Sequence, residues 1–257
     1  MLRPRIIPCL LVSDNGLVKT VKFKDPKYVG DPINAVKIFN EKEVDELLVV
    51  DIDATVQNRE PNYRLIGQFA VECRMPLCYG GGIKTVDQAR RIIGLGVEKV
   101  SLSAAALADP KLITAIADEV GRQSVVVVLD VKKKLLGGYE VFTHNGTKST
   151  KRSAVDVARE AEQRGAGEIV INNIDHDGVM KGYDLQLCKE LRSAVSVPMS
   201  FLGGAGTLEH VRDLLKVCGV VGAAAGSMFV FKGAYRAVLI NYPPRAQRDE
   251  LVAASIR

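Results

Sequence analysis

The feature that most constrains the fold is an internal repeat: two halves of the 257-residue chain match at a constant offset of 122 residues. In each half an acidic residue begins an apolar run, an aspartate follows the run, a proline leads the next run, and a glycine-rich turn ends it. The matched pairs are Glu46 and Glu168, Asp53 and Asp175, Pro76 and Pro198, and Gly81 and Gly203. A repeat of this length corresponds to half a domain rather than to a solenoid unit. We therefore expect one domain over residues 1–257.

Short apolar runs bounded by turn residues predict eight strands, and their continuous apolarity indicates burial on both faces. The runs are residues 5–12, 46–52, 76–80, 99–103, 125–131, 168–174, 198–203 and 220–226. Amphipathic segments of helical length lie between them, and Thr85 and Thr207 are placed to cap two of these helices. Eight alternations of strand and helix with a half-chain repeat predict an α/β fold, a single (β/α)8 barrel, rather than an open doubly wound sheet.

Two long segments follow barrel strands. Residues 13–32 carry several lysines, Lys19 among them, at the face where barrels hold their chemistry, and we expect a mobile cationic lid. Residues 132–150 contain His144-Asn145-Gly146, a hairpin turn signal that predicts a small β-ribbon.

Composition narrows the possible partners and location. The net charge is +5, but the basic residues are scattered without interleaved aromatics, which argues against nucleic acid and suits a small anionic substrate. The five cysteines form no CxxC pair or His cluster, so we expect reduced thiols, no metal and no organic cofactor. The first apolar run is too short for a signal peptide, and no run reaches membrane-spanning length, so we expect a soluble, cytoplasmic protein.

The glycine-rich turns are candidate phosphate sites, because backbone N–H groups at a helix N-terminus bind anions. The candidates are Gly81 and Gly82 in the first half, Gly203 and Gly204 in the second, and the small-residue patch Gly226-Ser227. Two matching cradles favour a ligand with two anionic ends. The alternative is that tight strand-to-helix packing requires small residues at these turns.

Acidic residues at strand ends are candidates for proton transfer. Asp130 closes an apolar run, where a carboxylate is costly without a purpose, and it is the best general acid or base. Asp51, Asp53, Asp175 and Asp177 follow other runs, and Asp177-Gly178 is equally compatible with an ordinary turn.

At the opposite strand ends, charged residues begin four runs. They are Arg5, Glu46, Lys99 and Glu168. Two cations and two anions there suggest a salt-bridged ring that closes the barrel floor, although solvated strand starts would show the same pattern.

Several stretches resemble the cyclase subunit of imidazole glycerol phosphate synthase, the HisF family, over essentially the whole chain. They include residues 5–10, 29–32, 45–47, 80–83, 98–101, 164–169, 174–178, 182–184 and 203–206. The resemblance implies a barrel that docks a glutaminase (HisH) subunit on its floor, conducts ammonia through its centre and joins it to a bis-phosphorylated ribonucleotide at the top.

The resemblance also implies residue roles. Asp130 matches the catalytic acid and Lys19 the lid lysine, while Arg5, Glu46, Lys99 and Glu168 match an ammonia gate. Substrate contacts fall on or beside Gly82, Ser101, Asp177, Gly178, Gly204 and Ser227.

Departures from the family pattern affect the chemistry. Leu11 stands where the family has its other catalytic carboxylate, and the next acid, Asp14, lies three residues further on. Ser103-Ala104 replaces Asn-Thr, Leu202 replaces a serine, and Asp53 replaces a neutral residue. A leucine cannot transfer a proton, so we expect ammonia handling to be kept and ring closure to be altered.

That pattern resembles HisF-like paralogues that work with a HisH-like glutaminase and a third protein in amidino-sugar synthesis for surface polysaccharides such as O-antigen. Two alternatives stay open: an authentic cyclase subunit of histidine biosynthesis, and a non-catalytic barrel scaffold that activates a glutaminase.

Overall fold

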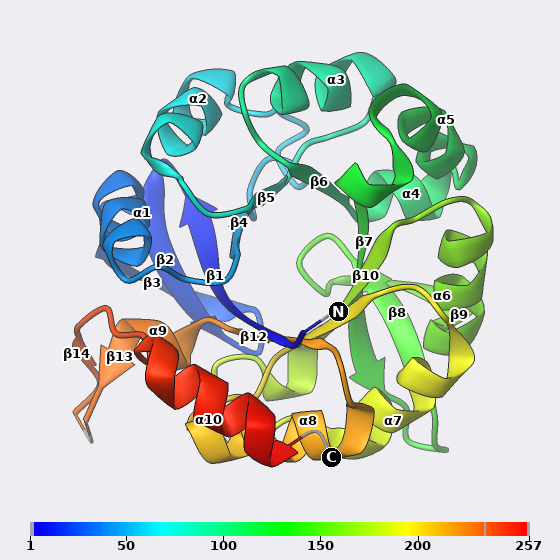
Figure 1. Cartoon of the computed structure of the whole chain (residues 1–257). Helices are drawn as coiled ribbons and strands as arrows, with labels where there is room; N and C mark the ends of the chain where they lie inside the picture. The colour runs from blue at the N-terminus through cyan, green and yellow to red at the C-terminus, as the bar shows by residue number, and fades with distance from the viewer. Residues whose placement is uncertain (1–2, 234, 256–257) are drawn as a thin grey trace.

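The computed structural model describes residues 3–233 and 235–255. Eight parallel strands close into a ring in which each strand pairs with two neighbours and the last returns to the first (Figure 1). In ring order they are β1 (Arg5–Ser13), β4 (Leu47–Asp51), β5 (Leu77–Gly80), β6 (Lys99–Leu102), β7 (Val125–Lys133), β10 (Glu168–Asn173), β11 (Met199–Leu202) and β12 (Gly222–Ala225). The predicted (β/α)8 TIM barrel is confirmed, and each predicted strand is present with ends that differ by at most two residues.

Helices surround the ring (Figure 1). They are α1 (Pro32–Glu41), α2 (Tyr63–Glu72), α3 (Val86–Gly94), α4 (Ala104–Ala108), α5 (Lys111–Val120), α6 (Ala154–Gln163), α7 (Leu185–Ala194), α8 (Leu208–Cys218), α9 (Ser227–Val230) and α10 (Arg245–Ser255), with short 3-10 turns at Arg122–Ser124 and Ile174–His176. The Thr85 and Thr207 hydroxyls accept backbone N–H groups three residues on, as predicted for helix caps. No described helix is long and apolar enough to cross a membrane.

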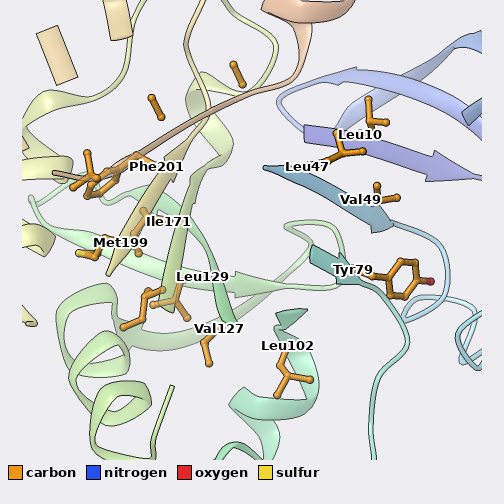
Figure 2. Close-up of a cluster of buried hydrophobic side chains, with 14 of the residues drawn as sticks. Leu10, Leu47, Val49, Tyr79, Leu102, Val127, Leu129, Ile171, Met199 and Phe201 are labelled. Atoms are coloured by element: carbon orange, nitrogen blue, oxygen red, sulfur yellow. The ribbon is translucent and has the colours of Figure 1, made fainter. Parts of the chain in front are cut away.

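Side chains alternate along each strand between two cores, which explains the continuous apolar runs. On β4, Leu47 and Val49 pack towards the helices, whereas Leu48 and Val50 pack in the barrel interior. Figure 2 shows part of the outer core, with Met199 and Phe201 of β11 close to Ile171 of β10. The inner core is smaller and consists of Ile7, Cys9, Leu48, Cys78, Val126, Val170 and Ala224.

Residues 13–32, which we expected to be a mobile cationic lid in a long loop, have regular strand structure. They form a hairpin of β2 (Gly16–Val21) and β3 (Lys24–Gly30), and β2 pairs with the end of β1, with Leu11 opposite Val18. The physical reason is that β1 continues beyond the barrel rim and reverses through Asp14 and Asn15, both with positive φ.

Two further excursions leave the barrel. Residues 132–150 hold the end of β7, β8 (Tyr139–Thr143) and the start of β9 (Lys148–Ser153), which form an antiparallel ribbon. A short pair, β13 (Phe231–Lys232) and β14 (Ala237–Val238), precedes α10. The ends of the expected domain, residues 1–2 and 256–257, lie outside the described residues.

Candidate functional site

An open cavity lies at the carboxyl ends of the barrel strands. Eight predicted site residues line it: Lys19, Gly81, Gly82, Ser101, Asp130, Asp177, Gly226 and Ser227. Three residues that we predicted to contact substrate do not line the cavity in the described part of the chain. They are Gly178, Gly203 and Gly204. The cavity also contains polar residues that sequence reasoning missed, chiefly Thr20, His144, Asn145 and Asn172.

Asp130 stands near the end of β7 beside Asn172 of β10, because the parallel register places the two residues opposite each other. The Asn172 amide donates to Asp130 Oδ1 at 3.0 Å. Burial, with a smaller contribution from the nearby Asp177, raises the pKa of Asp130 to about 7. A carboxyl group that titrates near neutral pH can both donate and accept a proton, as general acid–base chemistry requires.

Asn172 has an additional property. It is 9% exposed, and its Oδ1 has no hydrogen-bond partner among the described residues. A buried amide oxygen without a partner is costly, so a donor on a bound ligand would satisfy it.

Leu11, which the resemblance described above aligns with a carboxylate, lines the cavity. It is one of four partly buried side chains, Leu11, Val50, Val128 and Leu202, which pack on the inner core and line the cavity, and which we term the apolar collar. Two family departures, Leu11 and Leu202, therefore meet in one structural feature. The collar forms an apolar floor under the polar cavity.

The two nearby acids, Asp14 and Asp53, point to other parts of the structure than the described cavity lining. Asp14 is exposed at the tip of the turn after β1. Asp53 Oδ2 accepts hydrogen bonds from Ser13 Oγ at 2.8 Å and from the Asp14 backbone N–H at 3.1 Å. Both residues lie outside the described lining of the cavity.

Lys19 and Asp177 both line the side of the cavity next to the β2–β3 hairpin. Lys19 is 5% exposed, and its Nζ donates to the Cys9 backbone oxygen at 2.6 Å rather than to a carboxylate. Burial lowers the pKa of Lys19 and raises that of Asp177. Asp177 Oδ2 accepts hydrogen bonds from Thr20 Oγ1 at 2.7 Å and from the Phe23 backbone N–H at 3.2 Å. A lysine amine in this position can bind an anionic group of a ligand.

The two glycine turns are related by the repeat but differ in access. A Cβ on Gly81 would lie 2.4 Å from the Asp51 backbone oxygen, and one on Gly203 would lie 2.6 Å from the Asn173 oxygen. Both positions also have positive φ. Close backbone contact thus requires glycine at both turns, which is the packing alternative considered above. Only the first turn faces the cavity, so phosphate binding stays a prediction, with direct access at the Gly81-Gly82 turn and at Gly226-Ser227.

A charged ring closes the opposite end of the barrel. Arg5 donates to Glu46 and to Glu168, and Lys99 donates to the same carboxylates at 2.9 and 2.8 Å. Ser200 Oγ donates to Glu168 Oε1 at 2.6 Å. The two cations hold the pKa of Glu168 below its ordinary value. The alternating arrangement expected from the strand starts is present.

Between the ring and the collar the barrel interior is apolar. A small cavity lies directly above the ring. Its walls are Ile7, Glu46, Leu48, Cys78, Val126, Glu168, Val170, Ser200 and Ala224. Beyond the ring, a small neutral molecule contacts apolar walls and can pass at little cost. A charged molecule would lose its hydration there without gaining a polar partner, which is energetically costly.

Comparison with known proteins agrees with this architecture. The family model described as "Histidine biosynthesis protein" matches residues 5–236. A Vibrio vulnificus protein named "Putative imidazole glycerol phosphate synthase subunit hisF3" is 58% identical over 97% of this chain and 96% of its own length. A Pseudomonas aeruginosa protein named "Putative imidazole glycerol phosphate synthase subunit hisF2" is 57% identical over 95% of this chain and 97% of its own.

A relative from Exiguobacterium sibiricum, named "Imidazole glycerol phosphate synthase subunit HisF", is 42% identical over 89% of this chain and 91% of its own length. The similarity thus extends over both the charged ring and the cavity. On these grounds the chain belongs to the HisF family of histidine biosynthesis proteins.

Proposed function

We propose that this chain is the ammonia-accepting subunit of a glutamine amidotransferase, with its ring-closing chemistry weakened by the loss of one carboxylate. The single observation that carries this proposal is Leu11, an apolar side chain in the wall of a cavity that keeps Asp130. The ring of Arg5, Glu46, Lys99 and Glu168 is complete at the other end. A chain that retains the ring but lacks one of two acids is suited to deliver nitrogen.

The ammonia path in this proposal runs along the barrel axis. A HisH-like glutaminase docks on the floor, and ammonia enters through the ring. The apolar interior favours neutral ammonia over ammonium, because an unpaired charge is expensive in such surroundings. Ammonia then passes the apolar collar and reaches the cavity, where Asp130 exchanges a proton with the nitrogen acceptor.

The proposed ligand of the cavity is phosphorylated, with two anionic groups. Lys19, the Gly81-Gly82 turn, Ser101 and the Gly226-Ser227 turn are the residues proposed to hold it. The larger role we propose is amidino-sugar synthesis for O-antigen-type polysaccharides, in which a third protein uses the nitrogen. We assign the heterodimer of this chain and its glutaminase to the cytoplasm.

The experiment is ammonia-dependent turnover of the bis-phosphorylated ribonucleotide by wild-type protein and by Leu11→Asp. Restoring one acid–base group is worth about 10²–10⁴-fold in rate, so Leu11→Asp should exceed wild type by at least about 100-fold. A matched Leu202→Asp variant, with a carboxylate on the same collar but another strand, should not gain activity.

A second candidate function is an authentic cyclase of histidine biosynthesis. The observation in its favour is Asp130, whose pKa near 7 suits acid–base catalysis without a partner. Wild-type turnover equal to that of Leu11→Asp would establish this function and overturn the first. The scaffold alternative predicts that the bis-phosphorylated ribonucleotide does not bind at all, which equilibrium binding measures.

A further inference from the structure

The turn between β8 and β9 folds over the mouth of the cavity and places His144 in its wall. Three contacts hold this turn. Asn145 Nδ2 donates to the Ile52 backbone oxygen at 2.9 Å, and Lys132 Nζ donates to the Gly146 oxygen at 2.8 Å. Gly146 also lies against Ile174 and Phe23, so close that an added Cβ would meet them at 3.1 and 3.3 Å. The imidazole therefore comes from an anchored turn.

The ring of His144 is itself oriented. Its Nδ1 lies 3.0 Å from Thr143 Oγ1, and among the described residues Nε2 has no hydrogen-bond partner. The backbone at His144 has φ of +52°, a left-handed conformation that few residue types adopt readily. One nitrogen is held by the protein, and the other is available to a ligand.

The strand register brings His144 towards Asp130. Asp130 pairs with Phe142 across β7 and β8, and His144 follows two residues later, which corresponds to about 7 Å along a strand. The two groups thus stand on neighbouring parts of one cavity wall. The other acids of the cavity are already engaged, since Asp51 and Asp177 each accept two hydrogen bonds from the protein.

We propose that His144 is a second proton-transfer group of this cavity, acting with Asp130 in place of the carboxylate that Leu11 has removed. Ammonia adds to a carbonyl carbon of the ligand to give a carbinolamine. His144 Nε2 then accepts a proton from its nitrogen while the Asp130 carboxyl donates one to its hydroxyl oxygen, so that the C–O bond breaks, a C=N bond forms and water leaves. The proposal rests on the proposed function, because it assigns the turnover that wild-type protein retains to these two groups.

Near neutral pH, the surroundings leave His144 ready to accept a proton and Asp130 ready to donate one. Burial lowers the pKa of His144, and so does Lys148 on β9, so the imidazole is neutral and can accept a proton. Asp130, with its pKa of about 7, still carries a proton to donate in about half of the molecules at pH 7. The other charged groups on the surrounding elements are Lys132 on β7, and Lys19, Asp51 and Asp177 in the cavity. Two groups whose surroundings separate their roles in this way form a working acid–base pair.

The test compares His144→Gly with His144→Asn in the ammonia-dependent turnover of the bis-phosphorylated ribonucleotide. Glycine and asparagine both tolerate the left-handed backbone, so the turn is kept in either variant. Both should lower wild-type turnover by about 10²-fold or more. Exogenous imidazole should restore activity in His144→Gly, where a space is left, and not in His144→Asn. The wild-type rate should fall on the acid side of the pH profile, and this limb should vanish in both variants.

Three results would overturn the assignment: variants as active as wild type, loss of activity without imidazole rescue in His144→Gly, or a wild type with no turnover at all. The Leu11→Asp variant separates this failure from that of the proposed function. Activity in Leu11→Asp with a silent wild type rejects His144 and keeps the nitrogen-delivery role. Silence in both rejects the phosphorylated ribonucleotide as well.

Discussion

At the scale of single residues, Asp130 illustrates how a chemical role lowers stability. Its pKa is about 7 in the folded protein and near 3.8 otherwise, so the folded state binds the proton more tightly than the unfolded chain. The free energy of unfolding therefore falls as pH rises through this interval. We predict that Asp130→Asn removes this pH dependence and raises the free energy of unfolding at pH 8, because no buried carboxylate then has to ionise. We expect about 1–3 kcal/mol, less than the full pKa shift implies, since cavity water reaches part of the side chain.

Urea unfolding at pH 5 and pH 8 measures this difference. Asp118→Asn, at an exposed position on α5, is the matched control and should change the free energy by less than about 0.5 kcal/mol at either pH. A stabilisation by Asp130→Asn that is the same at both pH values would contradict the stated cause.

The residues that sequence reasoning found share a simple geometric basis. Asp130 and the ring residues stand at the ends of barrel strands, and all strand ends of one kind meet on one face. Asn172 and His144 were missed for different reasons. Asn172 lies in the site because the strand register places it opposite Asp130 of β7. His144 lies in the site because the β8–β9 turn folds back over the cavity. The local sequence pattern shows neither the strand register nor the position of the turn over the cavity. It did identify His144-Asn145-Gly146 as a hairpin turn.

At the scale of elements, the β2–β3 hairpin is latched to the barrel by Asp177. The carboxylate accepts hydrogen bonds from Thr20 and Phe23, and the Asp177 backbone oxygen accepts one from the Lys22 N–H at 2.9 Å. We predict that Asp177→Ala speeds trypsin cleavage after Lys22 and Lys24 by about 10-fold, because each side-chain hydrogen bond is worth about 1 kcal/mol against local opening.

Limited proteolysis followed by mass spectrometry measures the effect. Asp175→Ala is the control, since the Asp175 carboxylate accepts a hydrogen bond from the Lys133 backbone N–H instead. Equal cleavage of the two variants at the hairpin would show that the latch lies elsewhere.

The same hairpin contains strands that the sequence pattern did not predict. Barrel strands are buried on both faces, so their sequence is continuously apolar and readable. Most of β3 is exposed and contains Lys24, Asp25 and Lys27, which mimic a polar loop. Its pairing follows from the extension of β1 beyond the rim, which is a property of tertiary structure.

At the scale of the whole molecule, an apolar barrel interior separates the charged ring at one end from the polar cavity at the other. In the proposed function, ammonia must cross this interior. Ala224 of β12 is a small wall residue of the cavity above the ring, so its size helps to leave space there. In the proposed complex with a glutaminase, we predict that Ala224→Leu lowers glutamine-dependent nitrogen incorporation at least about 10-fold. Ammonia supplied from solution reaches the upper cavity from its open side, so that reaction should be nearly unchanged.

The ratio of the two rates is the measurement, because it cancels any general loss of folded protein. Ala223→Val is the control: Ala223 is on the same strand but packs in the outer core, where an added methyl pair costs stability of about 1–3 kcal/mol without entering the interior. A larger side chain at residue 223 should thus lower both rates together or neither. If Ala224→Leu also lowers both rates together, ammonia reaches the cavity by a route other than the barrel axis.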